Sequence, residues 1–302
     1  MAFTAKDVQT LRERTGCGMM DCKKALTEAD GNMDKAIEVL RERGLAAAAK
    51  KSGRIAADGL VFATINDDNN VGVVVEVNSE TDFVAKNEEF KSLVDICAKT
   101  IIKENPADVD ALLECQAAGT DMKIVELLRE KILKIGENIK VRRFVRMEGN
   151  LVTYIHGGGR IGVMVKFDTD VAAKEGFAEY AKDIAMQIAA ANPLFLDKSA
   201  VPSETLEKEK EIYMAQTMNE GKPANIAEKI VAGKISKYYK EVCLVDQAYI
   251  KDSDISVAKY TEKKAAELGG KISIVEFVRY EKGEGLEKRE DNFADEVASM
   301  VQ

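Results

Sequence analysis

The feature that most constrains the fold of this chain is an internal repeat. The segment GLVFATINDDNNVGVVVEV (59–77) is matched by NLVTYIHGGGRIGVMVKF (150–167). Each copy has two alternating apolar and polar stretches around a turn rich in Gly, Asn or Asp, which predicts a β-hairpin. Because the hairpin occurs twice, we expect the chain to build two similar layers.

The rest of each copy predicts helices and a third strand. TDFVAKNEEFKSLVDICAKTI (81–101) is matched by TDVAAKEGFAEYAKDIAMQI (169–188), a loop that leads into an amphipathic helix. After another helix, the strand IKVRRFVRMEG (139–149) is matched by ISIVEFVRYEKG (272–283). The predicted fold class is therefore α+β, with helices packed on a duplicated three-stranded antiparallel sheet.

The second copy contains an insertion, at about residues 192–242. It begins after Asn192-Pro193, which matches Asn105-Pro106 of the first copy. Two charged helical stretches, interrupted at Gly221-Lys222-Pro223, predict an antiparallel helical hairpin. Its apolar residues are too few for a core of their own, so they pack either within the hairpin or against a second copy or a partner. These residues include Ile212, Met214, Ile226, Ile230 and Ile235.

Helices are also expected outside the repeat. Residues 4–44 predict three short helices, the last of which ends at Gly44. This arrangement predicts a compact N-terminal bundle of the ubiquitin-associated type, in which the Met19-Met20 pair either belongs to the core or is exposed to a partner. In residues 284–302, Phe293, Val297 and Met300 share one face of a predicted C-terminal helix. The expected domains are an N-terminal bundle (1–45), a linker (46–58), core repeat 1 (59–149), core repeat 2 (150–283) and a C-terminal helical module (284–302).

Charge and composition argue against several classes of function. The net charge of −8 disfavours direct binding to nucleic acid, which needs a basic surface. No stretch approaches eighteen consecutive apolar residues, and the N-terminus has no apolar signal region, so we expect no membrane span and a cytoplasmic location. Five cysteines without a CxxC spacing and a single histidine lead us to expect reduced thiols, no metal site and no cofactor.

One glycine-rich pattern superficially resembles a dinucleotide site. Residues 157–162 fit G-x-G-x-x-G, but they join two strands of a hairpin and no helix follows at once. His156 lies beside these glycines at the hairpin tip, without an indicated nucleophile or acidic partner nearby. We therefore do not expect a nucleotide site, and His156 either contacts a partner or is exposed without a function.

The sharpest candidate site is Asp82-Phe83, between the strand ending at residue 77 and the next helix. The repeat supplies an internal control, because TDFVAKNEEF is matched by TDVAAKEGF, which lacks the phenylalanine. A phenylalanine needed for the shared fold would be expected in both copies. Phe83 either folds back on the following helix as a hydrophobic staple or, as we favour, is an aromatic wedge with a carboxylate beside it, presented to another protein.

Four motifs in order resemble the bacterial elongation factor Ts family, and the similarity runs over essentially the whole chain. They are LRERTGCGMMDCKKAL (11–26), VNSETDFVAKNEEF (77–90), HGGGRIGV (156–163) and GKPANIAEKIVAGKISKYYKEVCL (221–244). The resemblance implies a guanine nucleotide exchange factor, not an enzyme. Such a factor binds elongation factor Tu with GDP, displaces Mg²⁺ and promotes GDP release, so that GTP can rebind during translation elongation.

The resemblance also implies site residues. The segment of Thr81, Asp82, Phe83 and Val84 is expected to approach the partner's switch region and disturb its Mg²⁺ site. The N-terminal bundle is expected to contact the GTP-binding domain, a residue at the hairpin tip to lie near the nucleotide pocket, and a later residue to reach a further domain. The contacts implied at these three places are Arg12, Met19, Met20 and Lys23 in the bundle, His156 at the tip, and Ile250.

The resemblance extends to two further elements. The terminal helix is expected to dock on the partner, and the helical hairpin resembles a dimerisation element of some family members, which leaves a homodimer open.

Two other classes of function remain as alternatives. An adaptor or scaffold of the ubiquitin-associated type would rest on the N-terminal bundle alone and would leave Phe83 and the repeat unexplained. A small-molecule enzyme would use the glycine turn and His156, but the sequence indicates no residues to work with them.

Overall fold

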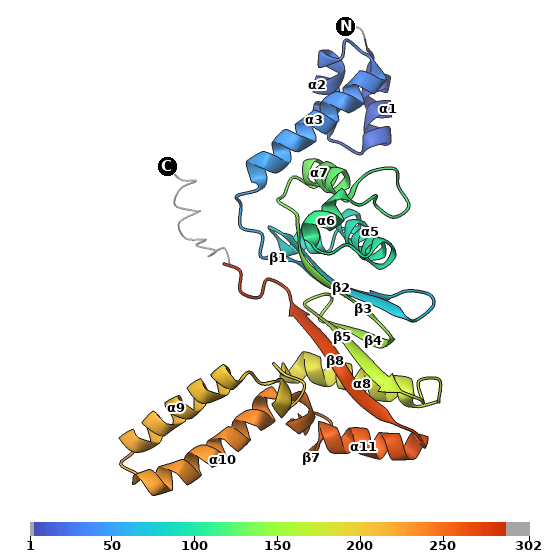
Figure 1. Ribbon diagram of the computed structural model, residues 1–302. Coiled ribbons are helices and arrows are strands. Elements are labelled where there is room, and N and C mark those ends of the chain that lie inside the picture. Colours follow the sequence, from blue (N-terminus) through green and yellow to red (C-terminus); the bar gives the residue numbers. More distant parts are fainter. Residues whose placement is uncertain (1–2, 288–302) are drawn as a thin grey trace.

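Two antiparallel three-stranded sheets, one from each repeat, form the middle of the molecule (Figure 1). The computed structural model describes residues 3–287. In both sheets the strand that closes the repeat pairs with the second strand of the hairpin. The first sheet has the order β1 (Asp58–Ile65), β2 (Val71–Ser79), β3 (Lys140–Glu148), and the second the order β4 (Asn150–His156), β5 (Ile161–Thr169), β8 (Ile272–Glu281).

The repeat extends to details of the strand register. The pairing of β2 with β3 shifts between Glu76 and Val77, and the pairing of β5 with β8 shifts at the matched place, between Lys166 and Phe167. Such a shift is a β-bulge, which bends a strand and re-aims the residues that follow it. The prediction of a duplicated antiparallel sheet is therefore confirmed.

Helices cover the outer face of each sheet, while the inner faces pack on one another. The first sheet buries one core against α5, α6 and α7, and the second buries another against α8 and α11. A smaller apolar cluster, with Val61, Val74 and Met164 at its centre, lies between the sheets. The covering helices are α5 (Glu88–Glu104), α6 (Val109–Glu114), α7 (Ile124–Ile135), α8 (Phe177–Ala191) and α11 (Val257–Leu268).

Matched glycines allow the two sheets to approach closely. A Cβ atom on Gly162 would lie 2.5 Å from Cγ1 of Val61, and one on Gly72 would lie 2.7 Å from Sδ of Met164. Each glycine is the second residue of the central strand of its sheet. The absence of a side chain at both places is thus a packing requirement of the interface between the repeats.

The matched Asn-Pro pairs end equivalent helices. Asn105 caps α5 with φ 47°, and Asn192 caps α8 with φ 45°. Asparagine tolerates this left-handed conformation better than most residues, and the proline that follows cannot continue a helix. The equivalence of these pairs predicted from the sequence is confirmed.

The N-terminal bundle contains α1 (Ala5–Thr15), α2 (Met19–Glu28) and α3 (Met33–Lys51). The predicted helix end at Gly44 is wrong, because α3 continues through Gly44 into the predicted linker and ends at Lys51. The Ala-rich and Lys-rich residues 45–51 have high helix propensity. Gly44 is buried where α3 crosses α7, and a Cβ atom there would lie 3.5 Å from the carbonyl oxygen of Arg129. The glycine thus belongs to a helix crossing.

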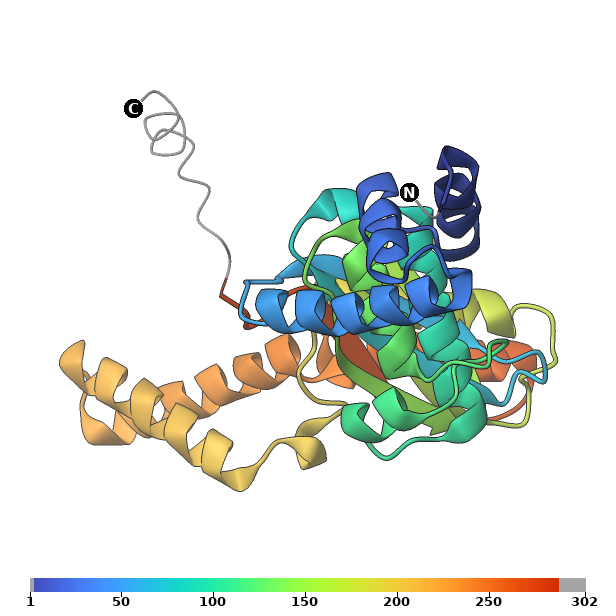
Figure 2. The same cartoon turned by 90° about the horizontal axis from the view of Figure 1, so that it is seen from above.

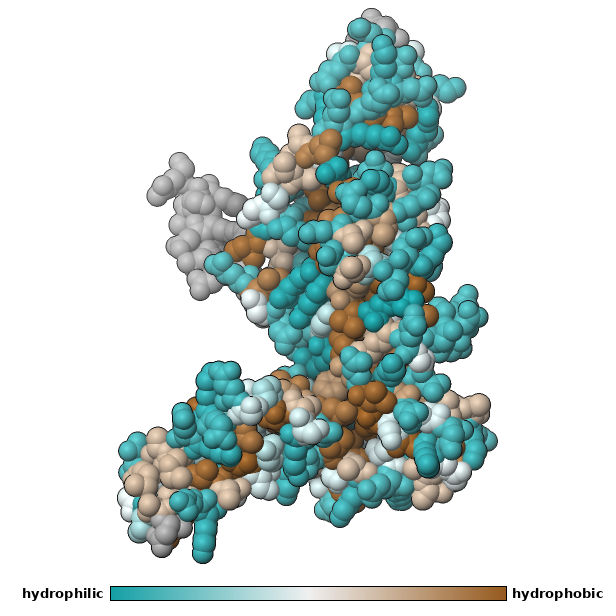
Figure 3. All heavy atoms as spheres, in the orientation of Figure 1, coloured by the Kyte–Doolittle hydropathy of each residue, from teal (hydrophilic) through white to brown (hydrophobic). Residues whose placement is uncertain are grey.

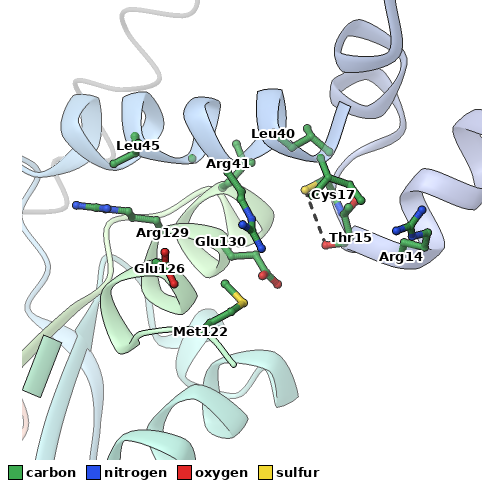
Figure 4. A pocket seen from close by; sticks show the side chains of 13 residues that line it. Arg14, Thr15, Cys17, Leu40, Arg41, Leu45, Met122, Glu126, Arg129 and Glu130 are labelled. Atoms are coloured by element: carbon green, nitrogen blue, oxygen red, sulfur yellow. Dashed lines mark hydrogen bonds between the residues drawn. The ribbon is translucent and has the colours of Figure 1, made fainter. Parts of the chain in front are cut away.

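A cavity of about 340 Å³ lies beside this crossing. Leu40 and Arg41 of α3 line it from one side, and Glu126 and Glu130 of α7 from the other (Figure 4). The bundle therefore contacts the helices of the first repeat where α3 crosses α7, and the cavity leaves this contact incompletely packed.

The insertion forms the predicted helical hairpin, with α9 (Ser203–Asn219) and α10 (Ala224–Val242) side by side and directed away from the sheets (Figures 1 and 2). Its apolar residues divide between the two predicted roles. Ile235 is buried and Met214 and Ile230 are half-buried, whereas Ile212 and Ile226 are exposed. Apolar atoms accordingly appear at the surface along the hairpin and where it joins the second repeat (Figure 3).

The remaining elements are short. They are α4 (Asp82–Ala85), the 3₁₀ turns η1 (Lys198–Ala200) and η2 (Leu244–Asp246), and the two-stranded ribbon of β6 (Ala248–Tyr249) and β7 (Asp252–Ser256). The predicted C-terminal helix, with Phe293, Val297 and Met300, lies outside the described residues. Among the described helices, none combines the length and the apolar character needed to cross a membrane.

Candidate functional site

Phe83 lies on a one-turn helix, α4, that follows the C-terminal end of β2, the central strand of the first sheet. Its side chain is 78% exposed, more than any other large apolar side chain in the described part of the chain. The hydrophobic-staple alternative is therefore wrong. The next residue, Val84, is buried in the core of the first repeat. The turn is anchored by Val84 while Phe83 points into solvent.

A charged pair accompanies the exposed ring. Lys86 Nζ lies 2.7 Å from Asp82 Oδ2 and 5.7 Å from the centre of the Phe83 ring. The hydrogen bond from Lys86 lowers the pKa of the Asp82 carboxyl, which is therefore ionised at neutral pH. The predicted aromatic side chain with an adjacent carboxylate is thus present, with a lysine as its local partner.

Thr81 is held by a residue far away in the sequence. The Glu137 carboxylate accepts hydrogen bonds from the Thr81 N–H (3.0 Å), from the Thr81 hydroxyl (2.7 Å) and from the Glu80 N–H (3.1 Å). Glu137 follows α7, after the left-handed cap Gly136. Glu137 is not among the site residues predicted from the sequence. The sequence does contain a signal for Glu137, because the second repeat has Gly270 at the matched position.

The predicted contact residues of the N-terminal bundle share one groove. Arg12, Met19, Met20 and Lys23 are all exposed and line a groove of about 1030 Å³ between α1 and α2. Met19 and Met20 therefore belong to the surface of the bundle, and the alternative that they form its core is wrong. Lys134 of α7 lines the same groove.

His156 and Ile250, which are distant in the sequence, line a single pocket of about 350 Å³. The Tyr154 hydroxyl lies 3.0 Å from His156 Nδ1, which orients the imidazole. Ile250 is exposed at the turn of the β6–β7 ribbon, and its N–H donates to Gln187 Oε1 (2.8 Å). Both residues are predicted contacts, but their closeness to one another could not be predicted from the sequence.

A buried carboxylate holds the β6–β7 ribbon in place. Asp183 of α8 accepts hydrogen bonds from the hydroxyls of Tyr249 (2.6 Å) and Tyr260 (3.0 Å) and from Lys251 Nζ (2.6 Å). Burial opposes ionisation of Asp183, but these three donors outweigh it and lower its pKa. The turn that presents Ile250 is therefore fixed to α8.

The glycine turn beside His156 has a packing role. The Val61 N–H of β1 donates to the Gly159 carbonyl (2.7 Å), and a Cβ atom on Gly159 would lie 2.9 Å from Cβ of Leu60. Leu60 pairs with Val77, a few residues before α4. The hairpin tip therefore lies against the end of the first sheet from which Phe83 projects.

A second buried carboxylate, Glu76 of β2, joins the first sheet to the segment that follows β8. It accepts hydrogen bonds from Arg142, Arg143 and Asn78 and from the Gly283 N–H. Burial disfavours the charged form, but these donors outweigh it and lower the pKa of Glu76. The segment that follows β8 is thus fixed to the first sheet.

The described residues were also searched for groups that could hold a metal ion. Across residues 3–287, no group of three or more His, Cys, Asp or Glu side chains could hold an ion. All five cysteines fall in this range and are free thiols. The site residues predicted from the sequence lie on three surfaces: the exposed Phe83, the bundle groove and the pocket of His156 and Ile250.

Comparison with known proteins identifies the family of the chain. Residues 80–284 match the family described as elongation factor TS. The elongation factor Ts of Clostridium perfringens (strain 13 / Type A) is 57% identical over 301 residues, 99% of each chain. Those of Clostridium kluyveri (strain NBRC 12016) and Clostridium acetobutylicum are 54% and 52% identical, again over 99% of each chain. Because the family match covers more than half of the chain and the relatives match nearly all of it, the chain belongs to the elongation factor Ts family.

Proposed function

We propose that this protein is the guanine nucleotide exchange factor for elongation factor Tu and that Phe83 is the side chain that it inserts into that partner. A role in nucleotide exchange during translation elongation follows from the family. The observation that carries the finer proposal is the environment of Phe83. An aromatic side chain 78% exposed to water, on a turn anchored by a buried neighbour, is the form expected of a residue that another protein buries.

The mechanism is a competition between two sets of contacts. GDP leaves slowly because phosphate loops and Mg²⁺ support one another electrostatically. Burial of Phe83 in a pocket of the partner would supply about 1.5–3 kcal/mol. Asp82 would bring a carboxylate next to the partner's switch region and help to displace Mg²⁺. No covalent bond is made or broken, so the protein acts as an exchange factor and not as an enzyme.

Two further surfaces would hold the partner while Phe83 enters. The groove of Arg12, Met19, Met20 and Lys23 would contact the GTP-binding domain. The pocket of His156 and Ile250 would serve the region near the nucleotide and a further domain of the partner. The groove is anchored to the first repeat through α7, and the pocket is anchored to the second repeat through α8. Distributed contacts of this kind would fix the direction from which Phe83 approaches.

The adaptor alternative is not favoured, because the family match, over residues 80–284, lies in the repeats and outside the N-terminal bundle. The likeness of the bundle to ubiquitin-associated domains, the domain boundaries and a cytoplasmic location remain parts of this proposal.

Release of fluorescent GDP from elongation factor Tu tests the function directly. The protein should accelerate release in proportion to its concentration until the partner is saturated. Linkage requires that GDP weaken the binding of this protein by the same factor by which the protein weakens the binding of GDP. A release rate equal to the spontaneous rate at saturating protein would refute the proposal.

A homodimer through α9 and α10 is a separate proposal, supported by the exposed side chains Ile212, Met218 and Ile226 on the hairpin. Sedimentation of the wild-type chain and of a double variant, Ile212→Glu with Ile226→Glu, tests it. The proposal expects a dimer that the double variant converts to a monomer. A wild-type chain that sediments as a monomer at all concentrations would rule it out.

A further inference from the structure

We propose that Glu137 is a positioning residue for Phe83. Its carboxylate fixes the backbone immediately before α4, so that the Phe83 ring is presented in one orientation before the partner arrives. The inference rests on the function proposed above and adds a residue to it that is distant from Phe83 in the sequence.

The contacts of Glu137 are concentrated on two consecutive residues. One carboxylate oxygen, Oε2, accepts the N–H groups of Glu80 (3.1 Å) and Thr81 (3.0 Å), and the other, Oε1, accepts the Thr81 hydroxyl (2.7 Å). In return, Glu80 Oε1 accepts the N–H of Asn138 (2.6 Å). Two carboxylates therefore cross-link the segment before α4 to the segment after α7, through hydrogen bonds that their charge strengthens.

α4 requires an external support of this kind. It contains four residues, Asp82–Ala85, which is too short for a helix that is stable by itself. Its N-cap, Thr81, is of a type that normally accepts a hydrogen bond from the helix backbone, yet no side-chain cap is formed. The Thr81 hydroxyl instead donates to Glu137. The turn is thus fixed by Glu137 before it and by the buried Val84 within it.

The second repeat provides an internal comparison. Val77 pairs with Val141 in the first sheet, and Phe167 pairs with Ile274 in the second, so Glu137 and Gly270 occupy matched places. Gly270 leaves no room for a carboxylate, because even a Cβ atom there would lie 2.2 Å from Cγ1 of Val171.

The two repeats share only part of this network. The strand register pairs Asn78 with Lys140 and Asp168 with Ser273, so Asp170 matches Glu80 and not Asp82, and the alignment predicted from the sequence is wrong at this point. Asp170 Oδ1 accepts the N–H of Lys271 (2.7 Å), just as Glu80 accepts that of Asn138 in the first repeat. Glu137 has no counterpart in the second repeat, and it occurs in the copy that carries Phe83. The exposed ring and the carboxylate that fixes its turn are therefore present together in one repeat and absent together from the other.

α7 also fixes the segment that follows α4. Glu89, in the first turn of α5, forms ion pairs with Lys131 and with Lys134, whose Nζ lies 2.6 Å from Glu89 Oε1. α4 is thus flanked on both sides by residues tied to α7 or to the turn that ends it. This frame fixes the backbone on both sides of α4, while the Phe83 side chain stays exposed.

Three variants of the full-length chain test the inference in the fluorescent-GDP assay. Glu137→Ala should lower the accelerated release rate on the order of tenfold, since hydrogen bonds to a charged acceptor are lost. Glu137→Gln should largely restore it, because the amide oxygen can accept both N–H groups while the NH₂ group donates to the Thr81 hydroxyl. Glu114→Ala, which removes an exposed carboxylate paired with Lys123 in the same repeat, should leave the rate unchanged.

A double-variant cycle separates positioning from general destabilisation. In the Phe83→Ala background, Glu137→Ala should cause no further loss of affinity for elongation factor Tu, because the ring that it positions is gone. Hydrogen–deuterium exchange should show faster exchange of the Glu80 and Thr81 amides in Glu137→Ala.

Two results would overturn the inference while the proposed function stands. One is wild-type exchange activity in Glu137→Ala, and the other is an equal loss of affinity for elongation factor Tu with and without Phe83. If the wild-type chain itself fails to accelerate release, the proposed function fails instead.

Discussion

Phe83 and Val84 are neighbours in one helical turn, yet their side chains have opposite environments. Phe83 is 78% exposed and Val84 is 7% exposed, packed in the core of the first repeat. A turn with one side chain in the core and the next in solvent has a defined orientation. Val84 therefore anchors the turn, and Phe83 is the side chain left to contact a partner.

Val84→Ala should therefore lower stability as well as activity. The loss of two buried methyl groups should reduce the free energy of unfolding by about 1–3 kcal/mol. Denaturant titration followed by circular dichroism measures this change. An unchanged midpoint would mean that Val84 does not anchor the turn.

Gly162 lies at the contact between the two sheets, and Gly44 lies where α3 crosses α7. The two glycines should respond differently to the addition of a methyl group. Gly162→Ala places a Cβ atom 2.5 Å from Val61 at the interface of the two sheets, so it should destabilise the protein by about 1–3 kcal/mol. Gly44→Ala places a Cβ atom 3.5 Å from the Arg129 carbonyl, an ordinary contact, and should stabilise α3 by about 0.5–1 kcal/mol. Thermal unfolding of both variants should shift in opposite directions. Equal shifts would contradict the close packing of the two sheets at Gly162.

The ion pairs of Glu89 predict a dependence of stability on pH. Hydrogen bonds from Lys131 and Lys134 lower the pKa of Glu89 from 4.5 to about 2. Because the folded-state pKa is lowered, the stabilisation is fully present above pH 4.5 and is lost as pH falls towards 2. The difference in melting temperature between the wild type and Glu89→Gln should therefore be largest near neutral pH and should shrink as pH falls below 4.5.

The matched control for this measurement is Glu88→Gln. Glu88 is adjacent in α5 and, within residues 3–287, its one ion pair is with the exposed Lys91. The melting temperature of the Glu88→Gln variant should stay close to that of the wild type across the same pH range. A difference for Glu89→Gln that does not change with pH would show that the ion pairs do not stabilise the fold.

The internal repeat made much of the fold predictable. It supplied both hairpins, the closing strands and the equivalence of Asn105-Pro106 with Asn192-Pro193, because local pattern and repetition agreed there. It also indicated that Phe83 is not part of the shared core, since the second copy lacks it. The helix end at Gly44 failed because a glycine at a helix crossing and a glycine at a helix end look the same in the sequence.

Contacts between distant segments were the part that local pattern could not supply. Glu137 bonds to Thr81 across 56 residues, and His156 shares a pocket with Ile250 across the insertion. Such pairs depend on how the layers pack, which a periodicity does not encode. The repeat contained one usable hint, the contrast of Glu137 with Gly270. The roles of the contact residues and the domain boundaries stay predictions.

Insertion of Phe83 into the partner is best tested by the rate of fluorescent-GDP release from elongation factor Tu with saturating Phe83→Ala. Because Phe83 is exposed, the variant should keep the circular dichroism spectrum and the melting temperature of the wild type. Leu194→Ala, which truncates another exposed apolar side chain, is the matched control. We expect Leu194→Ala to accelerate release as the wild type does, and Phe83→Ala to bring the rate close to the spontaneous one. Release with Phe83→Ala at the wild-type rate would contradict the role proposed for Phe83.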